Sequence, residues 1–336
     1  MKRFISVCLL FSLLLAGCAK EDREKNESSS IYLTSMDTVM QLTAYGAARE
    51  EALQKAQAEI ERLDDLLSIG KADSDVSRLN KNGSGDLSPD TAFLLAQALQ
   101  LYSDTRGLFD VTVYPVVRLW GFYDKNYHVP TDSELSAAMA LMGADRIFLA
   151  YDTGHAVLGQ GQSIDLGGIG KGYTSQRVTD ILKETGVESA MVSLGGNVQC
   201  LGTKPDGSQW NIGIRDPFGD SLYCAVSIAD KAVITSGGYE RYFVRDGKTY
   251  LHILDPRTGY PAESGLSSVS IISSDGTLGD GLSTALYIMG LEEAANYWRS
   301  HRDEFDAVFI TEDGTLYATE GLQGSIRSEH EIQFIS

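Results

Sequence analysis

Apolar residues recur every three or four positions between Ala47 and Leu67, and this spacing predicts an amphipathic helix. Ser88 followed by Pro89 is typical of a helix start, so a second helix is expected to begin there. The spacing of Thr131 and Glu134 is that of a capping box, which indicates a third helix. The first half of the chain is therefore expected to be mainly helical.

The second half predicts mostly β-strands, because short apolar runs alternate with glycine and polar turn residues. Asp246 and Gly247 are a strong signal for a hairpin between two of these runs. A helix from Lys171 to Thr185, further helices within residues 278–299 and a hairpin over residues 306–319 are also expected. The predicted strands cover residues 147–151, 155–158, 189–194, 198–201, 211–215, 222–229, 239–245, 250–254 and 267–273.

This order of elements predicts an α+β fold rather than a regular alternation of strand and helix. No internal repeat and no proline-rich linker divides the chain. We therefore expect mixed helices and antiparallel sheets in one large domain over residues 31–336. A chain of about 300 residues is also long enough for two fused lobes.

The N-terminus has the pattern of a bacterial lipoprotein signal. Lys2 and Arg3 precede an apolar run over residues 4–15, which ends in Leu-Ala-Gly-Cys at Cys18. We expect residues 1–17 to be a lipoprotein signal peptide and Cys18 to carry acyl chains that hold the protein on the extracytoplasmic face of the cell membrane. An ordinary secretory signal cut near Ala16 is the alternative. The charged and serine-rich residues 18–30 are expected to form a flexible tether.

The chain is strongly acidic, with a formal net charge of −18 over 336 residues. This charge disfavours nucleic acid as a partner, because its binding requires basic patches. An acidic protein also repels a pyrophosphate group unless a divalent cation lies between them. Cys200 and Cys224 form either one disulfide or two unpaired buried thiols, and the sequence leaves both possibilities open.

Two distant segments carry the most specific chemistry. Residues 165–173 form a glycine-rich run that contains Asp165 and Lys171, and such a run lets the backbone approach a phosphate closely. Asp280 and Thr284 stand four residues apart, so on a helix their oxygen atoms point from one face. Hard oxygen ligands at this spacing suit Mg²⁺. Together the two segments predict a metal-assisted site for a phosphorylated cofactor.

Each motif also has a simpler interpretation. The glycine-rich run lacks the P-loop and dinucleotide patterns, and alone it is equally typical of a strand-to-helix turn. Asp280 is, on its own, more often a solvated or capping residue, and Thr284 is often a packing residue. His252 lies in a dense motif that ends at Gly259. A single histidine is more often structural, but this one is a candidate general base at neutral pH.

Taken together and in order, these segments resemble the ApbE family, the FAD:protein FMN transferases. The resemblance runs from about Met36 to the last predicted hairpin, which is nearly the whole chain after the tether. It implies an ApbE-like, T-fold-related α+β fold. The matching segments are residues 36–38, 73–80, 109–115, 119–122, 165–173, 193–197, 213–217, 235–243, 252–259 and 280–284.

The resemblance implies a magnesium site and a reaction. It implies that Mg²⁺ is bound by the backbone carbonyl of Gly168 and by the side chains of Asp280 and Thr284. A threonine hydroxyl of a target protein attacks the FMN phosphorus of FAD and AMP is released, with His252 as the base that takes the proton. The targets implied are extracytoplasmic subunits of Rnf- or Nqr-type electron-transport complexes.

The resemblance also implies contacts with FAD. Asp165 and Lys171 match family positions that contact FAD, and five further positions, mostly apolar, suit a flavin or adenine face. The five further positions are Met36, Leu108, Phe109, Asp110 and Leu254.

Two other functions are compatible with the same site. One is that of a lipoprotein that binds FAD without chemistry. The other is that of a Mg²⁺-dependent FAD pyrophosphatase, in which water replaces the threonine.

Overall fold

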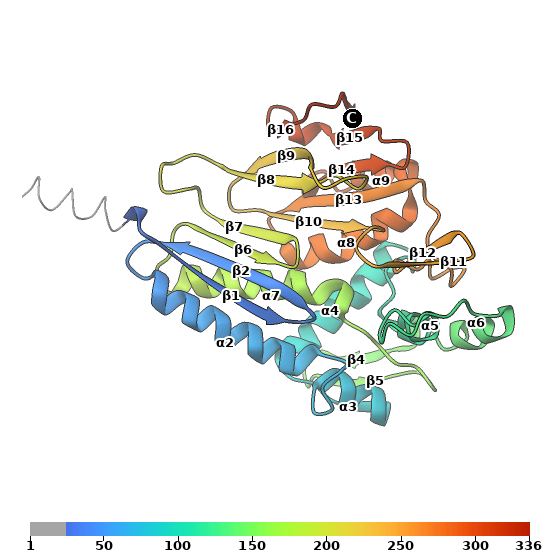
Figure 1. Ribbon diagram of the computed structural model, residues 1–336. Coiled ribbons are helices and arrows are strands. Elements are labelled where there is room, and N and C mark those ends of the chain that lie inside the picture. Colours follow the sequence, from blue (N-terminus) through green and yellow to red (C-terminus); the bar gives the residue numbers. More distant parts are fainter. Residues whose placement is uncertain (1–24) are drawn as a thin grey trace, which may run out of the picture.

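The largest element of the computed structural model, which describes residues 25–336, is a nine-stranded sheet (Figure 1). Its order is β1-β2-β6-β7-β10-β13-β14-β15-β17, and every neighbouring pair is antiparallel except β15 with β17. The strands are β1 (Ser28–Ser35), β2 (Thr38–Tyr45), β6 (Ala190–Leu194), β7 (Asn197–Leu201), β10 (Ala232–Gly237), β13 (Leu266–Ser273), β14 (Phe305–Thr311), β15 (Leu316–Thr319) and β17 (Ile332–Ile335).

Three smaller sheets and the helices complete the fold. The small sheets have the orders β16-β9-β8, β3-β5-β4 and β11-β12. Their strands are β3 (Ser84–Asp86), β4 (Phe148–Ala150), β5 (His155–Val157), β8 (Trp210–Arg215), β9 (Leu222–Ile228), β11 (Tyr242–Arg245), β12 (Lys248–Leu251) and β16 (Ile326–Arg327). The α-helices are α2 (Arg49–Leu67), α3 (Asp75–Asn82), α4 (Pro89–Asp104), α5 (Tyr114–Trp120), α6 (Asp132–Met139), α7 (Gly167–Glu184), α8 (Gly276–Met289) and α9 (Leu291–Arg299).

The large sheet is covered on both faces. Side chains alternate between the faces of a strand, and on β13 Ile271 belongs to the same hydrophobic cluster as Leu282 of α8, while Ile272 belongs to the same cluster as Ile212 of β8. Figure 1 shows α2, α7 and α8 on one side of the sheet and β8 and β9 on the other. Burial on both faces is visible in β13, where seven of the eight residues are buried although four of the eight are serine.

The predicted α+β class is confirmed, and so are the local helix signals. The apolar stripe of α2 packs on β2 and α7 in one hydrophobic cluster. The Ser88 side chain caps α4 by accepting from the Thr91 N–H at 3.4 Å. Thr131 and Glu134 form both hydrogen bonds of the predicted capping box at α6. These signals act within one or two turns, which is why sequence alone reveals them.

Several boundaries differ from the prediction. Helix α7 begins at Gly167 rather than Lys171, so the glycine-rich run is the first turn of the helix and not a loop before it. Strand β1 already begins at Ser28, so the folded domain starts a few residues before the expected boundary at 31. The strands β1, β2, β3, β10, β16 and β17 and the helices α3 and α5 were not predicted. The alternation in β2, where Met40, Leu42 and Ala44 are buried, was present in the sequence and was overlooked.

The N-terminal predictions lie outside the described residues. These are the signal peptide over residues 1–17, the lipidated Cys18 and most of the tether. In the part of the chain from residue 25 onward, no helix combines the length and apolarity needed to cross a bilayer. Cys200 and Cys224 are free thiols in the core, and burial raises the pKa of each to about 12.

Helices α7 and α8 approach each other closely at two glycines. A Cβ atom at Gly172 would lie 2.2 Å from the Gly276 carbonyl oxygen and 2.5 Å from the Asp280 Cβ. Neither neighbour is the free end of a flexible side chain, so the helices would have to separate to admit a methyl group. The glycine-rich run is therefore required, in part, for helix packing.

We predict that Gly172→Ala lowers the free energy of unfolding by about 2 kcal/mol or more, because it overpacks the α7–α8 contact. Gly170→Ala is the matched control on the same helix, since its new Cβ meets nothing closer than Leu67 at 4.0 Å. That control should be neutral or stabilising by up to about 1 kcal/mol, as expected for alanine in a helix. Urea unfolding of both variants measures the difference, and equal stabilities would contradict the packing argument.

Candidate active site

Asp280 is the buried centre of the candidate site. Its carboxylate accepts hydrogen bonds from the Gly172 N–H at 2.8 Å and from the Asn197 side-chain amide at 3.0 Å, and the residue is 5% exposed. Burial raises the pKa of Asp280, while the charge of Lys171 and these two donors act in the opposite direction. Each carboxylate oxygen has one further lone pair that can face a cation.

Thr284 lies one turn after Asp280 on α8, as the spacing predicts. Its hydroxyl lies 3.3 Å from the Ser236 hydroxyl, and Ser236 lies 2.7 Å from the Ser283 hydroxyl. Strand β10 thus holds Ser236 beside the face of α8 that carries both oxygen side chains. These contacts limit the side-chain freedom of Thr284 before any ligand binds.

The Gly168 carbonyl belongs to the first turn of α7. Its partner four residues later in a regular helix is the Gly172 N–H, and this N–H donates to Asp280. The backbone carbonyl of Gly168 is therefore a candidate third oxygen on the same side as the carboxylate. Phe109 packs in the angle between the two helices, 3.3 Å from the position of a Cβ at Gly168 and 3.6 Å from one at Gly281.

Asp165 and Lys171 flank the start of α7. The Asp165 carboxylate accepts from the Gly167 N–H at 2.8 Å and so caps a helix whose preceding residue, Leu166, offers no side-chain cap. Loss of solvent raises the pKa of Asp165, and the charges of Lys171 and Arg241 oppose the increase. The positive end of the α7 helix and the two cations beside it favour an anionic ligand such as phosphate.

His252 follows the β11–β12 hairpin and is oriented by the backbone at the other end of that hairpin. Its Nδ1 lies 3.1 Å from the Arg241 carbonyl oxygen. A carbonyl can only accept, so Nδ1 carries the proton and Nε2 has a free lone pair in the neutral ring. Burial and the charges of Arg241 and Lys171 lower the pKa of His252 to about 4.

The other residues predicted to contact FAD lie in different parts of the fold. Met36 forms the β1–β2 turn with a left-handed φ of +49°, a strained conformation for this residue, and its sulfur accepts from the Thr174 hydroxyl at 3.6 Å. Leu108 lies buried next to Phe109. The Asp110 carboxylate accepts from the N–H and hydroxyl of Thr112, so its role here is a cap.

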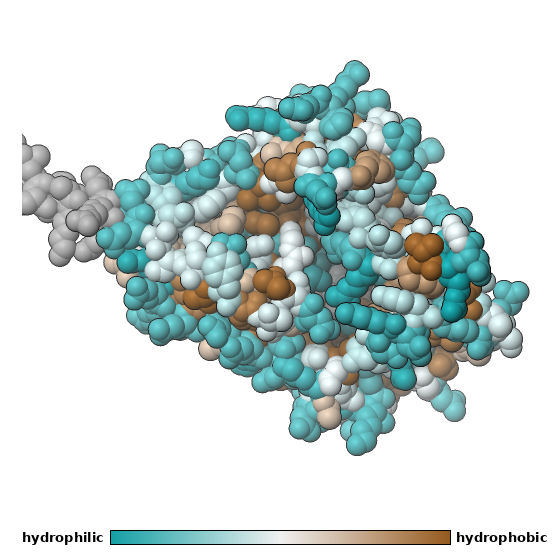
Figure 2. Space-filling view, viewed as in Figure 1, coloured by the Kyte–Doolittle hydropathy of each residue, from teal (hydrophilic) through white to brown (hydrophobic). Residues whose placement is uncertain are grey.

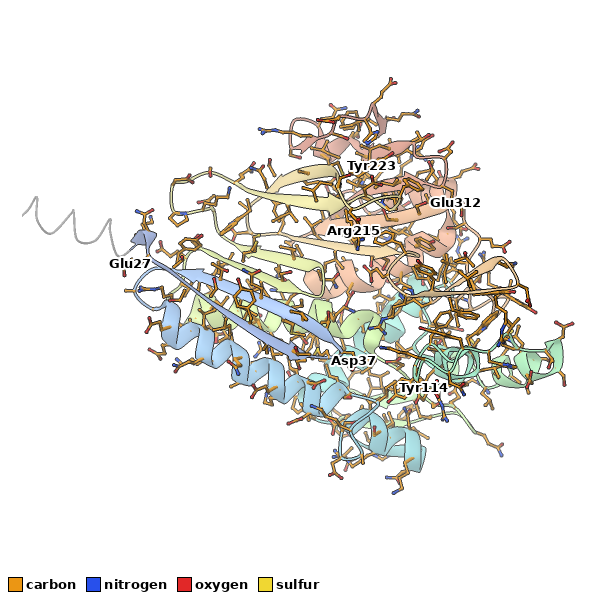
Figure 3. The ribbon with its side chains drawn as sticks, viewed as in Figure 1. Glu27, Asp37, Tyr114, Arg215, Tyr223 and Glu312 are labelled. Carbon is orange, nitrogen blue, oxygen red and sulfur yellow. The ribbon has the colours of Figure 1, made fainter. Side chains whose placement is uncertain are left out.

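Leu254 lies apart from Asp280, in the hydrophobic cluster that joins β11 to α5 and α6. Figure 2 shows a hollow near the middle of one face of the molecule. Figure 3 places three labelled side chains around that central region, each from a different element. They are Asp37 at the β1–β2 turn, Tyr114 at the start of α5 and Arg215 at the end of β8.

Sequence reasoning assigned no role to Asn197, Ser236 or Arg241. The first two touch the Asp280 and Thr284 side chains, and the backbone carbonyl of Arg241 orients His252. All three lie inside segments that matched the family resemblance. Their roles depend on contacts between distant parts of the chain, such as the 83 residues that separate Asn197 from Asp280.

An α+β domain with a carboxylate, a hydroxyl and a carbonyl beside a cationic helix start has the composition of a metal-assisted phosphate site. The chain belongs to the ApbE family, whose family model matches residues 36–309. The FAD:protein FMN transferase of Klebsiella pneumoniae (strain 342) is 38% identical over 262 residues, which are 76% of this chain and 80% of that protein. The FAD:protein FMN transferase of Vibrio cholerae serotype O1 is 33% identical over 316 residues, which are 92% of this chain and 94% of that protein.

Solved structures agree with this assignment. The ApbE protein of Thermotoga maritima superimposes with a TM-score of 0.83 at 30% identity and covers 88% of this chain and 98% of its own. The apo form of the flavinyl transferase ApbE of Pseudomonas stutzeri gives a TM-score of 0.80 at 31% identity. The match covers 89% of this chain and 98% of that structure. The α+β fold and the family are thus established together.

We predict that the His252 imidazole titrates with a pKa of about 4 in the free protein and is neutral from pH 6 to 8. AMP bound beside Lys171 and Arg241 should raise this pKa, because a phosphate offsets the two cations that lower it. NMR titration of the ring protons with and without AMP measures both values. A pKa near 6.5 in the free protein, or a decrease on adding AMP, would contradict this electrostatic account.

Proposed function

We infer that this chain transfers FMN from FAD to a target protein, the reaction for which its relatives are named. It is thus an enzyme, a flavin transferase. We propose that the transfer requires Mg²⁺, that the acceptor group is a threonine hydroxyl and that AMP is the leaving group. The observation that carries the proposal is the buried Asp280 carboxylate, which two donors hold one helical turn from Thr284 and beside Lys171.

The metal ligands proposed are the Asp280 carboxylate, the Thr284 hydroxyl and the Gly168 carbonyl. No group of three or more His, Cys, Asp or Glu side chains gathers for a metal among residues 25–336. A site with one carboxylate and two neutral oxygens suits Mg²⁺, which keeps several waters and binds substrate phosphates. The bound metal would offset pyrophosphate charge and stabilise the charge that develops on the AMP leaving group.

The FAD contacts proposed surround this oxygen set. Lys171, at the start of α7, would face the phosphates, and Asp165 holds that turn in place. Phe109 and Leu108 are both 4% exposed, and the Phe109 ring packs beside Gly168, so the apolar contacts proposed for them lie in the inner wall of the site. Met36 at the β1–β2 turn, Leu254 and Asp110 are the other proposed FAD contacts, and the fold holds each in place through neighbouring residues.

His252 is the proposed base. Its Nδ1–H donates to the Arg241 carbonyl, which leaves Nε2 free to accept the hydroxyl proton of the acceptor threonine. A base with a pKa of about 4 is weak at neutral pH. The phosphates of bound FAD would raise that pKa, so the substrate itself makes the ring a better base.

Two features of the wider proposal rest on the sequence. We propose that acyl chains on Cys18 anchor the protein to the extracytoplasmic face of the membrane. We also propose that the acceptors are subunits of Rnf- or Nqr-type complexes, which would be accessible from that side. FAD hydrolysis is the second candidate reaction, because a water molecule can take the place of the threonine at the same oxygen set.

Intact-mass spectrometry tests the proposed function. The chain from residue 25 onward is mixed with FAD, Mg²⁺ and the extracytoplasmic domain of an Rnf- or Nqr-type subunit, and AMP is followed in parallel. The expected result is a Mg²⁺-dependent gain of one FMN mass on the acceptor. Release of AMP and free FMN without that gain would favour hydrolysis. FAD that stays intact would contradict both reactions.

We predict that Asp280→Ala lowers Mg²⁺-dependent AMP release at least about a hundredfold, because it removes the only carboxylate proposed to bind the metal. Asp275→Ala is the matched control: it removes the N-cap of the same helix, with an expected stability loss of about 1 kcal/mol, but leaves the site intact. Activity in Asp280→Ala equal to that of the control would refute the metal assignment.

A further inference from the structure

Strand β8 has a free edge that ends near the candidate active site. It is the outer strand of the sheet β16-β9-β8, and within residues 25–336 no strand pairs with its other side. Trp210, Ile212 and Ile214 are buried against the large sheet, whereas Asn211, Gly213 and Arg215 are exposed. The edge is therefore accessible to an extended segment of another protein.

The register identifies which backbone groups of β8 are available. On β9, the Ser227 N–H donates to the Ser325 carbonyl at 2.8 Å, on the side of β16. The N–H and C=O of successive residues in an antiparallel sheet point to opposite sides, so Val226 faces β8, where it pairs with Ile212. The residues of β8 whose N–H and C=O groups point outward are thus Asn211 and Gly213.

This edge lacks the usual protection against pairing. Natural edge strands are blocked by proline, by bulges or by inward-pointing charges. Residues 210–214 contain no proline and no charge, the exposed Arg215 at the end is the one charged residue of the strand, and the irregularity in the ladder is an extra residue on β9, at Tyr223. Leu222 is 66% exposed and its side chain lies over Gly213, where it offers an apolar contact to a neighbouring strand.

The end of β8 is connected to the proposed metal ligands by direct contacts. The Arg215 guanidinium lies 5.6 Å from the centre of the Tyr239 ring. That ring lies against Gly237, next to Ser236, whose hydroxyl contacts Thr284. Figure 3 shows Arg215 at the end of β8, above the central region of the site. A segment that follows β8 is thus led toward the proposed metal ligand Thr284.

We propose that the acceptor segment of the target protein binds as an added strand on the outer edge of β8, between Asn211 and Arg215, and that this pairing delivers its threonine. The inference rests on the proposed function. In the step that follows, the threonine oxygen forms a bond to the FMN phosphorus, the bond from that phosphorus to the AMP oxygen breaks, and the hydroxyl proton passes to His252. Backbone pairing explains how one site accepts a segment without deep side-chain pockets.

Gly213→Pro tests the edge, because it removes an outward N–H without removing a β8–β9 hydrogen bond. Gly213→Ala is the matched control, since it introduces the same Cβ against Leu222 but keeps the N–H. We expect Gly213→Pro to raise the KM for the acceptor domain about tenfold relative to Gly213→Ala, the effect of one lost hydrogen bond and a disturbed register. The Kd for FAD, measured by flavin fluorescence, should be the same in both variants.

Three outcomes would overturn the inference. One is an equal KM in the two variants while the unaltered chain transfers FMN, which leaves the proposed function intact. Another is a change in molecular mass in solution on Gly213→Pro, which would mean that a second copy occupies the edge. The third is no transfer by the unaltered chain, which contradicts the proposed function itself.

A second measurement does not depend on the folding of the proline variant. Acceptor peptides are N-methylated at one backbone position at a time and supplied to the unaltered chain. Pairing on β8 requires every second N–H of the peptide, so transfer should fall at alternate positions only. A loss at every position, or at none, would contradict an added strand.

Discussion

The close contact between α7 and α8 is the constraint on which the site depends. At Gly172 the two helices leave no room for a methyl group, and this proximity allows the Asp280 carboxylate on α8 to accept a hydrogen bond from the backbone of α7. The same contact brings the first turn of α7, with its carbonyl and N–H groups, next to the oxygen side chains of α8. Helix packing and the geometry of the site therefore both require a residue without a side chain at Gly172.

The electrostatics of the site differ from those of the whole molecule. The chain has a net charge of −18, yet Lys171 and Arg241 both act on His252 and on Asp165. A local group of cations inside an acidic protein concentrates positive potential where a phosphate binds, and the acidic remainder disfavours anions elsewhere. Burial is the main reason why the pKa of His252 is lowered, and the charges of Arg241 and Lys171 lower it further.

Local patterns account for the part of the structure that sequence analysis predicted. The capping box at Thr131, the proline start of α4 and the helical spacing of Asp280 and Thr284 all involve residues within one turn of each other. The candidate site residues came from the family motifs, because the resemblance supplied what spacing alone could not. Strand β10 was missed, since its pairing partners lie far away in the sequence.

The roles of Asn197 and Arg241 escaped prediction for the same reason. A side-chain amide that orients a carboxylate 83 residues away leaves no periodic signal, and a backbone carbonyl that orients a histidine leaves no signal in residue type at all. Asp110 shows the opposite case: the family position was recognised, but its carboxylate is already bonded to Thr112. Residue identity indicates a place in a motif, whereas function also depends on which hydrogen bonds the fold has already used.

The β1–β2 hairpin also sets a working distance. Strand β1 runs from Ser28 to the turn at Met36, so its eight residues extend the chain by roughly 25 Å between the N-terminal end of the fold and the site. The turn at Met36 and the point where the chain enters the fold therefore lie at opposite ends of one strand, and whatever precedes Ser28 along the chain joins the fold well away from the candidate site.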